Sequence, residues 1–354
     1  MALSYPIVFG NTFDQLSASM QEAGIAGGSR LCLVTDSTVA RLYLDKVQKR
    51  LQENFPKTES FVFEAGEKSK TLETVQSLYL FLNRNHFQRS DILAALGGGV
   101  TGDLTGFTAA TYLRGIGFVQ VPTTLLAQVD SSVGGKTGVD FAGYKNIVGA
   151  FYQPRLVYMN TASLQTLSEE QFSAGMGEVI KTALIRDAVL FSWIEEHQNE
   201  LLQRDGSALE HVVRECCRIK SEVVEEDPFD KGIRAILNFG HTIGHAVEKE
   251  KNFSLLHGQC VSIGMAAAVR LSVKRNLLRP DEEERILRLL QRFSLPVSIS
   301  GIAEESIEKA CLSDKKREFE QLKFILLNGI GEACIEPAMT FTELGEGIRT
   351  IIDE

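Results

Sequence analysis

The sequence predicts two domains: an α/β domain built on a parallel sheet over residues 1–160, followed by a mostly α-helical domain over residues 161–354. Three observations support this prediction. The chain has 354 residues, which is long enough to form two hydrophobic cores. Strand-like and helix-like segments alternate in the first half, as is typical of a parallel sheet with crossover helices. Near residue 160 the hydrophobic pattern becomes helical and stays so.

Short apolar runs and amphipathic stretches define the expected elements. In the first half we expect strands at 30–35, 60–64, 91–96 and 117–121, with helices at 37–54 and 71–85. The second half opens at Ser168, and Gln171 three residues later completes a helix-capping pattern. Further helices are expected at 187–203, 207–226, 257–275, 281–293, 304–312 and 341–352, with a short strand at 324–327.

Composition and charge exclude several classes of protein. The 37 Lys and Arg residues against 46 Asp and Glu residues give a net charge of −9, so non-specific nucleic-acid binding is not expected. No apolar run approaches the length of a membrane span, and the N-terminus lacks a secretory signal pattern. The six cysteines are scattered without a Cys-x-x-Cys pair, which indicates reduced thiols. We therefore expect a soluble cytoplasmic protein.

Three consecutive glycines, at 97–99, directly follow the expected strand at 91–96. Glycines in this position let the backbone approach a ligand closely, and the N-terminus of the next helix can bind a phosphate group. The spacing differs from the usual G-x-G-x-x-G pattern, so a tight turn with close helix–strand packing is the alternative. Asp36, at the end of another expected strand, could accept hydrogen bonds from a ribose or simply cap a helix.

Three of the six histidines lie in one stretch of the second half: His241, His245 and His257. The spacing of four places His241 and His245 on one face of a helix, and neutral imidazole is a common zinc ligand. Helix-face or capping histidines are the alternative interpretation. Lys220, Arg234 and Asn238 lie nearby in the sequence and are unusual core residues. The stretch therefore predicts a metal site beside an anion site.

Six motifs together resemble one enzyme family along almost the whole chain. They are GGGVTGD at 97–103, YLRG at 112–115, PTTLLAQVDSSVGGK at 122–136, GEVIK at 177–181, LNFGHTIGHA at 237–246 and LHG at 256–258. On these residues the chain is similar to the 3-dehydroquinate synthases, the NAD- and zinc-dependent sugar-phosphate cyclases of the shikimate pathway. The resemblance implies a Rossmann-like, NAD-binding first domain, a helical second domain and an active site in the cleft between them.

The resemblance also implies a role for each matching residue. The metal ligands would be Glu178, His241 and His257, so that His245 becomes a proton-handling and phosphate-binding residue. NAD contacts would come from Asp36, Glu67, Lys70, Gly98, Gly99, Val100, Asp103, Thr123, Thr124 and Lys145. The phosphate of the substrate would be bound by Arg114 of a partner subunit, Lys136, Asn146 and Asn238. Its carboxylate would be bound by Lys220, Arg234 and one of Lys315 and Lys316, and its hydroxyls by Asp130 and Lys181.

One residue departs from the family pattern. The family usually has Glu where this chain has Asp230, which leaves the catalytic role of that carboxylate open. The implied reaction converts 3-deoxy-D-arabino-heptulosonate 7-phosphate to 3-dehydroquinate and phosphate, with transient oxidation by NAD, phosphate elimination, re-reduction and an intramolecular aldol closure. The implied assembly is a homodimer, and Zn²⁺ could be replaced by Co²⁺.

Other functions remain compatible with these residues. A zinc-dependent polyol dehydrogenase shares the order of domains but would not need Lys136, Lys220 and Arg234 to bind a phosphate and a carboxylate. A sibling sugar-phosphate cyclase acting on a substrate without a carboxylate would not need Lys220 and Arg234. A non-catalytic binding protein would be expected to lack a metal ligand, and all three are present.

Overall fold

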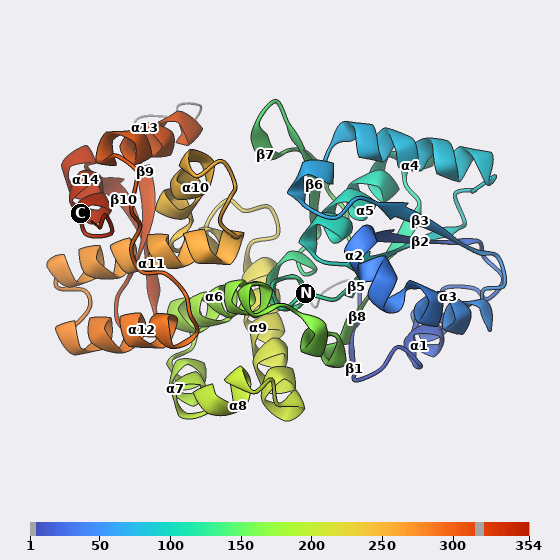
Figure 1. The fold of residues 1–354 in the computed structure, drawn as a ribbon, viewed down its shortest axis with the longest axis horizontal. Coiled ribbons are helices and arrows are strands. Elements are labelled where there is room, and N and C mark those ends of the chain that lie inside the picture. Colours follow the sequence, from blue (N-terminus) through green and yellow to red (C-terminus); the bar gives the residue numbers. More distant parts are fainter. Residues whose placement is uncertain (1–4, 316–321, 354) are drawn as a thin grey trace. The chain divides into compact units, whose positions relative to one another are not determined.

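The computed structural model describes residues 5–315 and 322–353, and the chain divides into two compact units between Leu167 and Ser168 (Figure 1). The change of sequence pattern predicts this boundary at residue 160, seven residues earlier. Among the described residues, no helix is both long and apolar enough to span a membrane. The two units are described separately below.

A six-stranded parallel sheet forms the centre of the first unit (Figure 1). Its spatial order is β1 (Ile7–Gly10), β8 (Leu156–Asn160), β5 (Gly117–Pro122), β4 (Ile92–Gly97), β2 (Leu31–Asp36) and β3 (Thr58–Phe63). Every neighbouring pair of strands is parallel. This confirms the predicted sheet, and the two strands that the sequence pattern does not predict, β1 and β8, lie together at one end of the strand order.

Helices cover both faces of this sheet because successive strand residues point to opposite sides. Leu31 and Leu33 belong to one apolar cluster, with α1 (Leu16–Glu22) and α3 (Asp45–Gln52). Cys32 and Val34 belong to the other, with α4 (Leu72–Arg84) and α5 (Gly99–Thr111). The single helix predicted at 37–54 is instead interrupted, since α2 (Ser37–Val39) and α3 flank a π-helical stretch at Ala40–Leu44.

The strand order reverses between β2 and β4. The chain passes from β2 outward to β3, then returns to the other side of β2 to form β4. In open parallel sheets, ligands bind outside the carboxyl ends of the strands at such a switch point. The last residues of these two strands are Asp36 and Gly97, so the topology brings two of the motifs found in the sequence to one place.

The first unit also contains an antiparallel hairpin that the sequence pattern does not predict. Strands β6 (Lys136–Phe141) and β7 (Tyr144–Phe151) are joined by two residues, Ala142 and Gly143, with φ of 52° and 82°. Two consecutive positive φ angles are typical of the type I′ turn, whose twist matches that of a hairpin.

The second unit is mostly helical, as predicted, with one two-stranded sheet (Figure 1). Its helices are α6 (Glu169–Arg186), α7 (Ala188–Glu196), α8 (Gln198–Leu202), α9 (Gly206–Glu226), α10 (His241–Glu250), α11 (His257–Lys274), α12 (Pro280–Arg292), α13 (Glu304–Lys315) and α14 (Phe341–Arg349). The sheet pairs β9 (Leu322–Leu327) with β10 (Ala333–Met339). The helix predicted at 187–203 is two helices, α7 and α8, which meet at His197.

Glycines allow α11 to approach α6 and α10 almost backbone to backbone. A Cβ atom added to Gly258 would lie 1.9 Å from the carbonyl oxygen of Ala174 on α6. One added to Gly264 would lie 1.9 Å from the carbonyl oxygen of Gly240, next to α10. These separations are far shorter than any real van der Waals contact, so no side chain fits at either position. The spacing of the three helices depends on these glycines.

This packing predicts a large cost for Gly264→Ala. The added methyl group must push α10 and α11 apart, and overpacking of this kind costs about 1–3 kcal/mol or more of unfolding free energy. Gly206, the first residue of α9, has no atom within 4 Å of the corresponding Cβ position and is the matched control. Gly206→Ala should be neutral or stabilise by up to about 1 kcal/mol. Urea denaturation of both variants tests the prediction, and equal stabilities would contradict the packing described here.

Candidate active site and metal centre

The glycine loop of the first unit joins the end of β4 to the start of α5. Gly98 is the N-cap of α5, and its φ of −78° is available to any residue. Close packing explains Gly97, because a Cβ there would lie 2.4 Å from Thr101 Oγ1, and also Gly102, where it would lie 2.7 Å from Gln120 Oε1. The loop thus has the close helix–strand packing that the sequence allowed as an alternative. The α5 N-terminus retains the geometry that favours an anion.

Asp36 acts as a helix cap in the structure. Its Oδ1 atom accepts hydrogen bonds from the backbone N–H groups of Thr38 (2.9 Å) and Val39 (3.0 Å). Its Oδ2 atom accepts a hydrogen bond from the Thr101 hydroxyl at 3.4 Å, which connects the end of β2 to the first turn of α5. The capping interpretation is therefore correct, and contact with a ribose stays a prediction.

Four of the charged residues expected to contact NAD form a cluster around Lys70. The Lys70 side chain is buried, and its Nζ atom donates to Asp103 Oδ2 at 2.6 Å and to Asn146 Oδ1. Lys145 Nζ lies 3.3 Å from Glu67 Oε1. Burial lowers the pKa of Lys70, but the negative charges of Asp103, Glu67 and Asp140 outweigh it, so the pKa is raised overall. Lys70 is therefore a buried cation held by acidic neighbours.

A pocket of about 310 Å³ lies between this cluster and the β6–β7 hairpin. Asp103, Lys136 and Asn146 line it, so two of the residues expected to bind the substrate phosphate are brought together. Gly138 and Gly149, which are paired across the hairpin, also line the pocket, and a Cβ atom at either would crowd the backbone of the opposite strand, at 2.9 Å from the Val148 oxygen and 2.4 Å from the Thr137 oxygen respectively. The pocket combines a cation and an amide with a surface that a phosphate group could approach.

Further residues of the first unit for which the sequence predicts a role near the glycine loop or the substrate are Val100, Thr123, Thr124 and Asp130. Val100 is in the first turn of α5, and the backbone N–H of Thr123 donates to the Gly97 carbonyl at 2.9 Å. The Thr124 hydroxyl accepts a hydrogen bond from the Ala127 backbone N–H at 3.2 Å. Asp130 lies in a π-helical stretch, Ala127–Ser131.

Arg114 lies at the end of α5 opposite the glycine loop. The thirteen residues of α5 span roughly 20 Å, at about 1.5 Å per residue. Arg114 and Leu113 have φ of 64° and 51° in a turn where both are exposed. A left-handed conformation is costly for residues with side chains, and such strain is often found at interaction sites.

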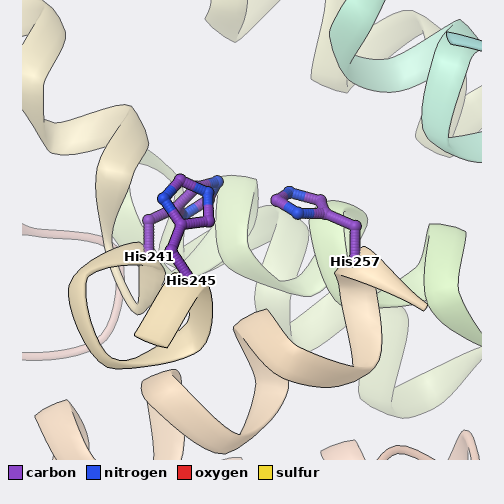
Figure 2. Close-up of side chains that lie close together, drawn as sticks. All are labelled: His241, His245 and His257. Carbon is purple, nitrogen blue, oxygen red and sulfur yellow. The ribbon is translucent and has the colours of Figure 1, made fainter. Parts of the chain in front are cut away.

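Three histidines of the second unit come together, as Figure 2 shows. His241 is the first residue of α10, His245 lies one turn later and His257 is the first residue of α11. Their ring centroids are 5.2 Å, 5.2 Å and 5.6 Å apart, and one nitrogen of each ring lies within 4.8 Å of the others. The three histidines singled out in the sequence can therefore share one metal ion.

A fully buried carboxylate, Glu178 on α6, faces two of these rings. Its Oε1 atom lies 3.6 Å from His257 Nε2 and 3.9 Å from His241 Nε2. Two ligand atoms each about 2.1 Å from a tetrahedral zinc ion are roughly 3.4 Å apart, so these separations fit a shared ion. Within the described part of the chain, neither Glu178 oxygen has a hydrogen-bond donor in suitable geometry, although Oε2 forms an ion pair with buried Lys181. A buried carboxylate in this position fits a cation.

His241 is held in the protonation state that a metal ligand needs. Burial lowers its pKa well below the ordinary value, and the positive charges of Lys181, His245 and His257 lower it further. Its Nδ1 atom lies 3.1 Å from the carbonyl oxygen of Phe239, to which it can donate. With the proton on Nδ1, Nε2, which lies 3.9 Å from Glu178 Oε1, keeps a lone pair that is available to a metal.

Besides Lys181, the second unit contains two further buried cations, Lys220 on α9 and Arg234. Arg234 and Asn238 belong to a short 3₁₀ helix, Ile233–Asn238, and Arg234 Nη1 donates to the Pro228 carbonyl at 3.0 Å. The preceding loop is held by Asp227, which accepts hydrogen bonds from the backbone N–H groups of Lys231, Gly232 and Arg234. In that loop Asp230 has a φ of 58°. Lys316 and the side chain of Lys315 lie outside the described residues.

Two carboxylates, one in each unit, are given no role by the sequence motifs. Asp140 accepts a hydrogen bond from the Asn146 backbone N–H at 2.9 Å, and burial raises the pKa of Asp140. Glu248 is buried on α10, with Oε2 3.6 Å from His257 Nδ1. The spacing of seven residues from His241, two helical turns, could have indicated that Glu248 shares its face of the helix.

The Lys70–Asp103 pair predicts a strong effect of removing one partner. Asp103→Ala should lower the free energy of unfolding by about 3 kcal/mol, because it leaves Lys70 buried with less compensating charge. The double variant Lys70→Met/Asp103→Leu should recover most of that loss. The exposed pair Arg288 and Glu284 is the control, and Glu284→Ala should change stability by less than about 0.5 kcal/mol. Urea unfolding measures all three, and similar losses for the buried and exposed pairs would show that burial does not set the cost of breaking the Lys70–Asp103 pair.

Two family models and many curated proteins match this chain. The family models described as "3-dehydroquinate synthase N-terminal" and "3-dehydroquinate synthase C-terminal" match residues 60–174 and 175–317. The 3-dehydroquinate synthase of Acetivibrio thermocellus is 43% identical over 323 residues, covering 91% of this chain and 89% of that protein.

Two solved structures share the fold at higher sequence divergence. The 2-epi-5-epi-valiolone synthase of Streptomyces hygroscopicus, solved with NAD⁺ and Zn²⁺, is 29% identical with a TM-score of 0.90, covering 99% of this chain and 97% of that chain. A 2-deoxy-scyllo-inosose synthase, solved with carbaglucose-6-phosphate, NAD⁺ and Co²⁺, is 28% identical with a TM-score of 0.89, covering 98% and 96%. By its sequence relatives and its two family models, this chain belongs to the 3-dehydroquinate synthase family.

Proposed function

We propose that the protein is a 3-dehydroquinate synthase, which converts 3-deoxy-D-arabino-heptulosonate 7-phosphate to 3-dehydroquinate and phosphate. The observation that carries this proposal is the buried Glu178 carboxylate facing the Nε2 atoms of His241 and His257, in a chain with family relatives over nearly its whole length. This donor set suits a catalytic zinc site, which uses three protein ligands and leaves one position for substrate.

We assign the metal ligands as Glu178, His241 and His257 rather than as the three histidines. Glu178 supplies a buried negative charge that a divalent cation would neutralise, whereas His245 is exposed. His245 is then available to accept or donate a proton while binding the substrate phosphate. Co²⁺ could take the same site, because it accepts the same nitrogen and oxygen ligands.

We place NAD at the carboxyl ends of β2 and β4. The N-terminus of α5, with Gly98, Gly99 and Val100, would bind the pyrophosphate. Asp36 would accept hydrogen bonds from a ribose. The other residues assigned to the cofactor are Glu67, Lys70, Asp103, Thr123, Thr124 and Lys145. When bound, NAD would supply a hydride acceptor and donor, and zinc would supply a Lewis acid for the oxygen of the substrate hydroxyl that is transiently oxidised.

The chain's own residues would bind and orient the charged groups of the substrate. Lys136 and Asn146, which line one pocket, would hold the phosphate together with Asn238 and His245. Lys220, Arg234 and one of Lys315 and Lys316 would bind the carboxylate through charge-assisted hydrogen bonds. Asp130 and Lys181 would orient the ring hydroxyls. Asp230 is assigned near the reacting groups, where the family usually has Glu, and its shorter side chain would reach less far.

Phosphate release is the experiment that tests this function. Purified protein supplied with zinc, NAD and the heptulosonate phosphate should release phosphate, should require NAD, and should accumulate no NADH. Accumulation of one NADH per turnover would instead indicate a polyol dehydrogenase. A heptulose phosphate without the carboxylate is the control substrate. If it reacted as fast as the heptulosonate, the roles of Lys220 and Arg234 would be wrong and a sibling cyclase would be indicated.

We further propose a homodimer in which Arg114 completes the phosphate site of the partner subunit. The support is that Arg114 is exposed in a strained turn at the end of α5 opposite the glycine loop, where it is accessible to a second chain. A guanidinium contributes bidentate hydrogen bonds that a lysine cannot replace.

Mixing two inactive variants tests this arrangement. Arg114→Ala and Lys136→Ala should each lose most activity, because each removes a cation that binds the phosphate. After subunit exchange, some activity should return, since one site of each hybrid dimer is then intact. Exchange is verified by mixing differently tagged chains. A lack of recovery despite proven exchange would contradict the shared site without affecting the proposed reaction.

A further inference from the structure

A second buried carboxylate lies on the far side of the His257 ring from Glu178. Glu248 is only 3% exposed, and its Oε2 atom is 3.6 Å from His257 Nδ1. The other ring nitrogen, Nε2, is 3.6 Å from Glu178 Oε1. His257 is itself half-buried. These two distances mean that its imidazole has one carboxylate near each ring nitrogen.

The local fold explains why Glu248 meets His257. The chain reverses just after α10, where Asn252 and Phe253 have φ of 51° and 57°. The backbone N–H of Phe253 donates to the carbonyl of Glu248 at 2.9 Å, so a hydrogen bond connects the reversing segment directly to the Glu248 backbone. Helix α11 then begins at His257, beside the last turns of α10.

The two imidazoles that face Glu178 each have an oxygen atom near their other nitrogen. His241 Nδ1 lies 3.1 Å from the Phe239 carbonyl oxygen, and His257 Nδ1 lies 3.6 Å from Glu248. A neutral imidazole carries one proton, so an acceptor beside Nδ1 keeps that proton there and leaves the Nε2 lone pair for a metal. At 3.6 Å the Glu248 carboxylate lies at ion-pair rather than hydrogen-bond distance, so it is its negative charge that favours the proton on Nδ1 and makes Nε2 more basic.

We propose that Glu248 is a positioning residue of the metal centre, which fixes the tautomer and orientation of His257 and so raises the affinity for zinc. This inference rests on the proposed ligand set of Glu178, His241 and His257. The competing explanation is that Glu248 serves only the packing of α10 against α11. In that case its loss would lower stability without selectively weakening metal binding.

Zinc affinity separates the two explanations. Metal-free protein is titrated with Zn²⁺ in competition with a chromophoric chelator, for the original sequence, Glu248→Ala and Glu248→Gln. Loss of this outer partner should weaken zinc binding by roughly 10- to 100-fold in Glu248→Ala. Glu248→Gln should lose less, because its amide oxygen can still accept a hydrogen bond from Nδ1–H. The graded order of the two variants is a result that a packing role does not predict.

Two further variants make the result decisive. Glu282→Gln is the matched control, because Glu282 is a buried carboxylate at 7% exposure on α12 that caps its own helix. It should bind zinc as the original sequence does. His257→Ala should lose zinc binding, and if it did not, the proposed ligand set would itself be wrong.

The outcomes distinguish this inference from the proposed function. If His257→Ala loses zinc while both Glu248 variants bind it within about twofold of the original affinity, the ligand set holds and the role of Glu248 is overturned. Thermal unfolding of the metal-free proteins identifies a variant that has lost its fold. The near-isosteric Glu248→Gln keeps the test available if Glu248→Ala does not fold.

Discussion

The burial of the Glu178 carboxylate is the constraint on which the organisation of the second unit depends. Removing a carboxylate from water costs several kcal/mol unless a cation or hydrogen-bond donors replace the water. Lys181 supplies one positive charge, and the Nε2 atoms of His241 and His257 approach from two other helices as atoms that would share a cation with the carboxylate, not as hydrogen-bond donors to it. These contacts are possible because Gly258 lets α11 reach α6, and Gly264 lets it reach the start of α10. The glycines and the buried acid are thus parts of one arrangement.

The first unit gathers polar and charged groups at one edge of its sheet. The reversal of strand order brings Asp36 and the glycine loop to one edge, and close packing at Gly97 and Gly102 keeps α5 against the strands. Lys70 is buried at this edge by sharing its charge with Asp103. The sheet therefore provides a rigid support, while the hairpin adds Lys136 and Asn146 at a pocket.

Sequence patterns predicted the elements that have strong local periodicity. The apolar runs at 31–36 and 92–97 are buried on both faces, and continuous runs of this kind are typical of central parallel strands. The sequence pattern does not predict strand β1, because it has only four residues, and it does not predict the β6–β7 hairpin, because glycines interrupt the alternation there. The π-helical interruption at Ala40–Leu44 contains no helix-breaking residue from which it could be predicted. In these cases long-range pairing or packing decides the local structure.

The site was predictable to the extent that its residues form motifs. The spacing of His241 and His245 identifies both residues, but spacing alone pairs them with each other and not with Glu178. Glu178 lies about sixty residues earlier, and only the fold brings it to His241 and His257. Glu248 forms no motif with His257, because the chain reversal between α10 and α11 creates their proximity. Three-dimensional contacts, rather than residue types, therefore determine which side chains can share an ion.

The most direct test of Glu178 as a metal ligand compares the equilibrium dissociation constant for zinc in Glu178→Gln and His245→Gln. Glu178→Gln should weaken zinc binding by two orders of magnitude or more, on the order of 3 kcal/mol, because a neutral amide replaces a charged ligand. His245→Gln should stay within a few-fold of the original affinity. The reverse order, with zinc held by three histidines and indifferent to Glu178, would contradict the assignment of this buried carboxylate to the metal.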